Sequence, residues 1–199
     1  PPPPPTRLDT GTIESFEAAL EAEHPQTRLS AHRGLVRALI DEDALARAEA
    51  AAERGLGWFE NDPVLLALLE ESHRRRRQWE GVVSTLRRRL SAADGTEQRL
   101  ALHKALARVL EVELAAEAAA LEVLRQAERE GPFDIEVSRS TERLLRARMA
   151  WDELVRTLRN RVEHGTATER SEGRFGLARI ALEVGYDPES AWSEIEAGL

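Results

Sequence analysis

Apolar residues recur along the chain at the three- and four-residue spacing that places them on one face of an α-helix. In the first such segment, 13–23, Ile13, Phe16 and Leu20 share a face, and Pro25 ends the helix. From residue 27 the pattern divides into helix pairs, with a short turn inside each pair and a longer turn after it. The predicted pairs are 28–40 with 43–59, 63–76 with 79–92, 96–113 with 116–130, 134–148 with 151–164, and 166–184 with 188–199.

Two segments of the sequence return later in the chain. The segment 79–90, WEGVVSTLRRRL, returns as 151–162, WDELVRTLRNRV, and half of its positions are identical. The segment 106–127 returns in the same way as 177–198, so two alternating units build one longer repeat. Self-similarity of this kind is typical of a solenoid of stacked helix pairs, each of which buries its apolar face only against its neighbours.

The third pair carries a family resemblance. Ala120, Leu124, Ala127 and Pro132 have the spacing of the small, large, small and proline positions in the second helix and trailing turn of a tetratricopeptide repeat. Its first helix resembles the large-small-large signature, beginning at Leu106, once one extra residue is allowed before the second helix, and the fifth pair needs the same insertion. The other pairs are more diverged. The chain therefore resembles a degenerate tetratricopeptide array.

This resemblance implies an all-α fold, a right-handed superhelical solenoid of about five hairpins whose first helices line a concave face. We expect a proline-rich spacer at 1–11, a leading helix at 12–26 and the repeat array at 27–199, with pairs at about 27–62, 63–95, 96–133, 134–165 and 166–199. The first residue is proline and the start lacks the regions of a signal peptide. We therefore expect the chain to be an excerpt of a longer protein.

Composition agrees with a helical, ordered chain. Alanine, leucine, glutamate and arginine dominate, and only 5% of the 199 residues are aromatic. The net charge of −8 argues against a nucleic-acid-binding domain, and the apolar runs fall far short of the roughly 20 residues of a membrane span. Basic charge is almost all arginine, which suggests a GC-rich bacterial source. Because the chain has no cysteine, its composition does not indicate whether the protein works in an oxidising or a reducing compartment.

The sequence offers no constellation typical of an enzyme. The five histidines are scattered, and the two Glu-x-x-His pairs, at Glu21 with His24 and at Glu70 with His73, lie in different repeats. A glycine-rich phosphate loop, a nucleophile elbow and a cysteine nucleophile are all missing. We expect a non-catalytic protein with no metal site and no cofactor.

Basic residues lie along the first helices of the pairs, although the chain as a whole is acidic. On the tetratricopeptide pattern the groove-facing positions hold Arg33, Arg37, Arg74, Arg75, Lys104, Arg108, Arg139, Arg143, Arg146 and Arg179. The resemblance implies a scaffold that binds a partner protein, and such a groove suits an acidic peptide because the planar guanidinium can pair with a carboxylate through two hydrogen bonds.

Other interpretations of these arginines stay open. They are also compatible with an ordinary solvated helix face, in which case the array is a spacer that sets the distance between flanking domains. The basic clusters at 74–77 and 87–89 also allow a nucleic-acid-binding helical repeat, a weaker alternative because only Trp79 is close enough to stack on bases.

The last predicted helix carries an apolar stripe. Trp192, Ile195 and Leu199 stand at i, i+3 and i+7, and no polar capping helix follows them. We expect further chain or another subunit to cover part of this surface.

Overall fold

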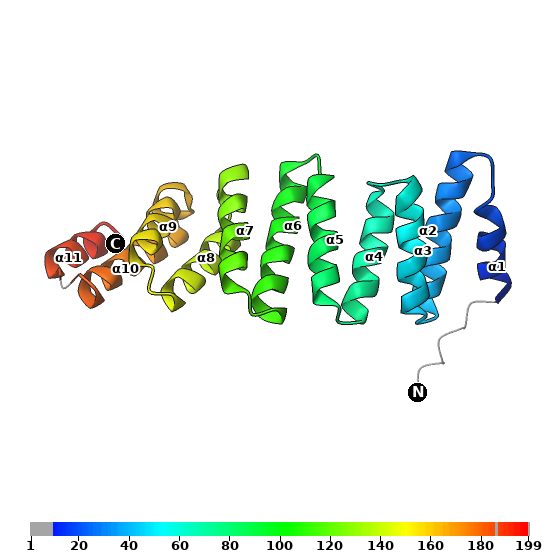
Figure 1. Ribbon diagram of the computed structural model, residues 1–199. Coiled ribbons are helices and arrows are strands. Elements are labelled where there is room, and N and C mark those ends of the chain that lie inside the picture. Colours follow the sequence, from blue (N-terminus) through cyan, green and yellow to red (C-terminus); the bar gives the residue numbers. More distant parts are fainter. Residues whose placement is uncertain (1–9, 186, 199) are drawn as a thin grey trace, which may run out of the picture. The chain divides into compact units, whose positions relative to one another are not determined.

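The computed structural model describes residues 10–185 and 187–198, and every regular element in this part of the chain is helical. The chain forms two compact units, divided between Asp94 and Gly95. In the first unit (Figure 1) the helices are α1 (Thr10–Ala19), α2 (Pro25–Asp41), α3 (Leu45–Trp58), α4 (Pro63–Arg75) and α5 (Trp79–Ser91). In the second they are α6 (Thr96–Arg108), α7 (Glu117–Glu130), α8 (Ile135–Ala147), α9 (Trp151–His164), α10 (Ala167–Glu183) and α11 (Pro188–Glu196), with a π-helical turn η1 (Val109–Glu113) after α6.

The all-α fold class predicted from the hydrophobic pattern is confirmed, and each predicted helix has a counterpart in the structure. Local chemistry explains where the helices begin. Proline stands in the first turn of α2, α4 and α11, where its missing N–H group is not needed. A capping box begins α10, where Thr166 accepts from the Glu169 N–H and the Glu169 side chain accepts from the Thr166 N–H. Most of the predicted proline-rich spacer lies outside the described residues.

The core of the first unit is built from leucine and alanine. Each helix packs on its neighbour in the sequence, and α2 also packs on α4. On α3, Ala48, Ala51 and Ala52 are fully buried, and their small side chains let α2 and α4 approach closely. The predicted stripe of α1 packs on this core, through Ile13 together with Phe16 and Leu20. A Cβ atom at Gly34 would lie only 2.4 Å from the Phe16 ring, so a larger residue there would force this ring to move.

The helices α2 to α5 recur as α6 to α9. The helices α3 and α7 have the same length and matching ends, and so do α4 and α8. Between the first and second helices of its first pair, the second unit has one residue more than the first unit, and this extra residue lies in η1. In the first unit the Ala44 N–H donates to Leu39 O (2.8 Å), whereas in the second the Ala116 N–H reaches one residue further, to Leu110 O (2.7 Å). The π-helical turn therefore holds the extra residue that the resemblance required.

The fifth pair has the same insertion. Its Asp187 N–H donates to Ala181 O at 2.9 Å, and these two residues correspond in the repeat to Ala116 and Leu110. The final helix leaves Trp192 60% exposed, and Leu199 lies outside the described residues. By position, Trp192 corresponds to Leu121 of α7, which is only 3% exposed. Coverage of this end by further chain or another subunit stays a prediction.

The short turns inside the pairs share a strained conformation. Asp43, Arg77, Ala115 and Met149 each precede the second helix by a residue or two and have φ between 50° and 58°. This left-handed region costs a residue with a side chain roughly 1–2 kcal/mol. In three of the four turns the next N–H donates to the carbonyl five residues back, which satisfies the end of the first helix.

Replacing Met149 by glycine should therefore stabilise the second unit. Met149 is 71% exposed and loses little packing, and relief of the strain outweighs the unfolded-state entropy of glycine by about 0.5–1 kcal/mol. Urea denaturation followed by circular dichroism measures the change. The matched control is Ala147→Gly, two residues earlier at the end of α8, which should destabilise by a similar amount. A loss of stability in Met149→Gly would contradict the inference that the Met149 backbone is strained.

Candidate partner-binding face

The predicted site residues lie on first helices of the pairs, on α2 and α4 in the first unit and on α6, α8 and α10 in the second. We call the surface that they share within each unit the first-helix face. Five of these ten bases pair with an acid 29 to 34 residues away in the sequence, namely Arg33, Arg37, Lys104, Arg139 and Arg143. The face is therefore a ladder of paired charges, and its binding capacity depends on which bases remain unpaired.

Asp62 anchors the first rung. It caps α4 by accepting the Leu65 N–H at 2.8 Å, and its carboxylate also accepts two hydrogen bonds from Arg33 of α2, one of them 3.1 Å long from Nε. Burial raises the pKa of this carboxyl, but the bonds from Arg33 and the α4 backbone outweigh burial and hold the pKa below its usual value. The Asp62 carboxylate therefore caps α4 and also binds Arg33 of α2.

Glu71 of α4 joins two more of the predicted bases. It accepts from Arg37 Nη1 at 3.0 Å and from Arg75 Nη2 at 2.9 Å, while Arg75 also donates to the Ile40 carbonyl at 3.1 Å. Arg37 and Arg75 therefore lie close together, but both are already paired with the same acid, Glu71. All three side chains stay at least about a third exposed, so the pairs contribute little to stability.

Arg74 belongs to a triad whose central acid, Glu70, is buried. Its Nε donates to one oxygen of Glu70 at 2.8 Å, and Arg89 of α5 donates to the other oxygen. The triad connects the first and second helices of the pair. Sequence reasoning missed it, although all three residue types return together at the corresponding positions of the second unit.

The second unit repeats the triad with Glu142, Arg146 and Arg161. Arg146 Nη1 lies 3.0 Å and Arg161 Nη2 2.7 Å from different oxygens of Glu142. The Arg161 side chain is only 4% exposed and also donates twice to Ser138 Oγ, at 3.1 Å each. A guanidinium this deeply buried depends on Glu142 for its neutralisation.

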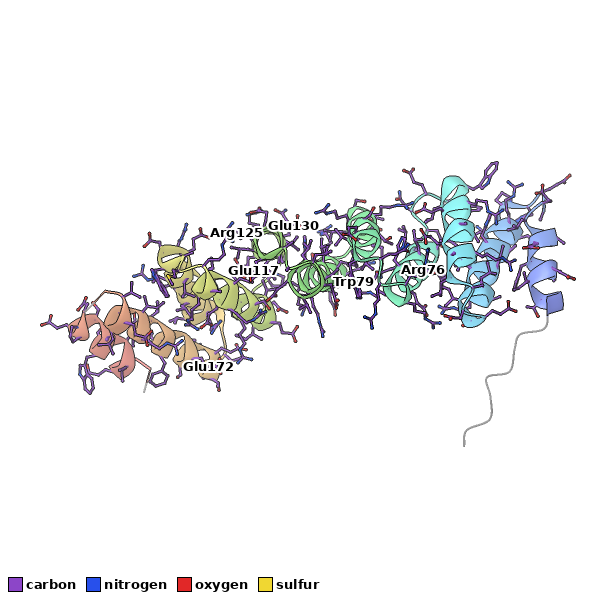
Figure 2. All side chains as sticks on the ribbon, turned by 60° about the horizontal axis from the view of Figure 1, so that its bottom comes forward. Arg76, Trp79, Glu117, Arg125, Glu130 and Glu172 are labelled. Carbon is purple, nitrogen blue, oxygen red and sulfur yellow. The ribbon has the colours of Figure 1, made fainter. Side chains whose placement is uncertain are left out.

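Lys104 repeats the role of Arg33 in the second unit. It donates to Asp134, the N-cap residue of α8, at 3.1 Å and to Glu136 at 2.8 Å. The next rung is Arg139 of α8 with Glu172, which projects from α10 (Figure 2), at 2.8 Å. Both rungs join consecutive first helices within this unit.

One charge reversal breaks the repetition. Arg37 in the first unit pairs with Glu71, but the corresponding positions in the second hold Arg108 and Arg143, two bases. Arg143 turns instead to Glu111 of η1, with Nη2 at 3.0 Å. Arg108 is exposed and makes no ion pair or side-chain hydrogen bond with any described residue.

Unpaired charge continues along this face of the second unit. Arg179 of α10 is also exposed and has no such partner in the described part of the chain. On α8, Arg139, Arg143 and Arg146 line a shallow cavity of about 470 Å³ together with Glu142 and Ala147. Arg146 Nη2 is buried there without a hydrogen-bond partner. Of the predicted residues, the two that form no ion pair with a described residue, Arg108 and Arg179, both belong to the second unit.

The described residues offer little for other chemistry. Among them, no group of three or more histidines and carboxylates could hold a metal ion. Two histidines, His32 of the first unit and His103 of the second, occupy corresponding positions of the repeat, and both are buried. Burial, helped by nearby arginines, lowers the pKa of His32. None of the described helices is long and apolar enough to cross a membrane.

Comparison with solved structures identifies the fold. YrrB, a tetratricopeptide-repeat protein described as having an unusual peptide-binding site, is similar over 94% of this chain and 91% of its own, with 16% identity and a TM-score of 0.53. A double mutant of MamA (RS-1 ArsTM) is similar over 85% of this chain and 93% of its own, with 11% identity and a TM-score of 0.50. In sequence, no protein-family model and no curated protein matches. The predicted tetratricopeptide-like fold is confirmed.

Removing the central acid of the buried triad should destabilise the second unit strongly. Glu142→Gln leaves the Arg161 guanidinium buried without a counter-charge, and breaking such a pair costs about 3–5 kcal/mol. Glu172→Gln is the control, because its partner Arg139 is more than half exposed, and should cost about 0–1 kcal/mol. Urea denaturation of both variants measures the two changes in the free energy of unfolding. Equal, small losses would show that Arg161 is not neutralised by Glu142.

Asp62 should make stability depend on pH. Because its folded pKa is lowered, its charge stabilises the protein above the unfolded value of about 3.9, and this contribution is lost as the pH falls through the folded value. Asp62→Asn keeps a good N-cap but loses the charge, so it should cost about 1–2 kcal/mol at pH 7 and progressively less as the pH falls through the folded pKa of Asp62. Exposed Asp41→Asn is the control. A cost independent of pH would contradict this assignment.

Proposed function

We propose that this tetratricopeptide-like solenoid is a non-catalytic interaction scaffold that binds an acidic peptide segment of a partner protein on the first-helix face of its second unit. The observation that carries the proposal is the charge reversal between Glu71 and Arg143, which leaves Arg108 without an acid. Arg179 extends the same unpaired charge to α10.

The chemistry of this face suits a carboxylate ligand. Arg143 and Arg139 are more than half exposed, and their acids Glu111 and Glu172 hold them in position without burying them. A ligand carboxylate could pair with Arg108 directly and reach the arginine-lined cavity on α8. YrrB, whose fold is similar, is described as having a peptide-binding site, which agrees with a peptide as the ligand.

A structural spacer is the second candidate. The ladder of ion pairs in each unit fastens successive first helices, and this arrangement also suits a stiff rod. In that case no ligand occupies the face.

Nucleic acid is supported less well. The basic clusters of the first unit hold seven arginines, and five of them are paired with glutamates, namely Arg74 and Arg89 with Glu70, Arg75 with Glu71, Arg76 with Glu49, and Arg88 with Glu53. Little of this charge is left for phosphates.

Charge reversal tests the proposed face. Arg108→Glu with Arg143→Glu should weaken binding of a fluorescein-labelled octaglutamate peptide at least about tenfold, equivalent to about 1.4 kcal/mol, because two attractive contacts become repulsive. Fluorescence anisotropy at low and physiological salt measures the affinity. The control combines Arg87→Glu and Arg159→Glu, exposed positions on second helices. Equal losses in both variants, or affinity insensitive to salt, would reject the face, and no binding at all would favour the spacer.

A further inference from the structure

The second unit contains a cavity system at a place where the first unit has a closed apolar core. Two cavities, of about 600 and 520 Å³, lie among α7, α8 and α9 and share Glu128 and Asn160 in their walls. We call them together the second-helix groove. None of the predicted groove residues lines it, so it is distinct from the first-helix face.

The origin of the groove can be read from the repeat. In the first unit, Leu56, Leu66 and Leu69 are at most 2% exposed and belong to one apolar core. The corresponding positions of the second unit hold polar residues, in the same order Glu128, Ser138 and Thr141. Three core leucines are thus replaced by shorter or polar side chains at the place where the cavities open.

These polar groups are incompletely satisfied. Ser138 accepts from Arg161, but Thr141 Oγ1 is buried without a hydrogen bond of normal geometry. Burial raises the pKa of Glu128, and this effect exceeds the lowering by Thr141 and two nearby arginines. Asn160 makes no side-chain hydrogen bond with any described residue. A packing defect alone would be lined by apolar atoms and stay dry, whereas unsatisfied polar groups favour a polar occupant.

The two halves of the groove differ in chemistry. The larger half includes apolar residues, namely Leu100, Phe133 and Val137. The smaller half is lined by three arginines, Arg125, Arg129 and Arg156, and by two glutamates, Glu128 and Glu153. Arg125 lies between α7 and α9 (Figure 2) and is paired with Glu153 of α9, whereas Arg156 is exposed and has no ion pair in the described chain.

We propose that the second-helix groove binds an extended peptide that carries an apolar and an acidic side chain a few residues apart. The apolar side chain enters beside Phe133 and Val137, and the carboxylate pairs with Arg156. At the junction, the Asn160 carboxamide offers one acceptor and two donors, which match the N–H and C=O groups of a peptide backbone. The site would give the scaffold a second binding surface, independent of the first-helix face.

The test is an NMR titration of the ¹⁵N-labelled chain with three acetylated, amidated octapeptides. Each contains one leucine and, at the third position after it, glutamate, glutamine or lysine, with alanine and serine elsewhere. The glutamate peptide should shift amide signals of α7, α8 and α9, including the Asn160 side-chain signal, with a dissociation constant at least about tenfold below that of the lysine peptide. No shifts at millimolar peptide, or shifts confined to the first-helix face, would overturn the proposal.

Variants separate a binding site from a defect. Thr141→Leu restores the residue of the first unit, so it should fill the smaller cavity, keep or raise the melting temperature and weaken peptide binding at least about tenfold. Asn160→Ala and Arg156→Glu alter only partly or fully exposed positions and should also weaken binding, whereas Arg159→Glu, on the same helix, should not. Arg108→Glu with Arg143→Glu should leave these shifts unchanged. Binding that survives Thr141→Leu, Asn160→Ala and Arg156→Glu would rule the groove out.

Discussion

The packing of each helix against its sequence neighbours is the interaction on which the rest of the structure depends. Leucine fills the space between helices, and buried alanines such as Ala48 and Ala120 keep neighbouring backbones close. Because this packing also brings α2 beside α4, arginines and carboxylates 29 to 34 residues apart in sequence can meet across the first helices. The charged ladder is therefore a consequence of the apolar core rather than its cause.

The two units use one framework for different surfaces. Both carry a helix-capping aspartate held by a base of the preceding first helix, and both carry a glutamate held between two arginines. The differences lie at a few positions on this common framework. Glu71 becomes Arg143, which frees charge on one face, and a cluster of core leucines becomes polar around Thr141, which opens a groove on another. Both proposed binding surfaces arise from these departures from the repeat.

The sequence was sufficient for the helices and the fold because both follow from local periodicity and from helix-start signals such as Pro63, although Pro25, expected to end the first helix, instead begins α2, and α1 already ends at Ala19. It also indicated an inserted residue in the third pair, although only the structure shows that η1 takes it up. The partners of the arginines could not be predicted, because they depend on the lateral register of first helices that another helix separates in the sequence. Arg33 and Arg37 illustrate this limit, since their partners Asp62 and Glu71 lie 29 and 34 residues further along the chain.

The central claim is that unpaired arginines on the second unit's first-helix face are the primary site for acidic ligands. Arginine side-chain NMR tests this claim most directly, by following the Nε–Hε signals while the octaglutamate peptide is added. The signals of Arg108 and Arg179 should shift with a common dissociation constant, while Arg33 and Arg37, whose carboxylate partners are already in place, should move little. Equal shifts of all four arginines, or shifts only in the first unit, would contradict the account.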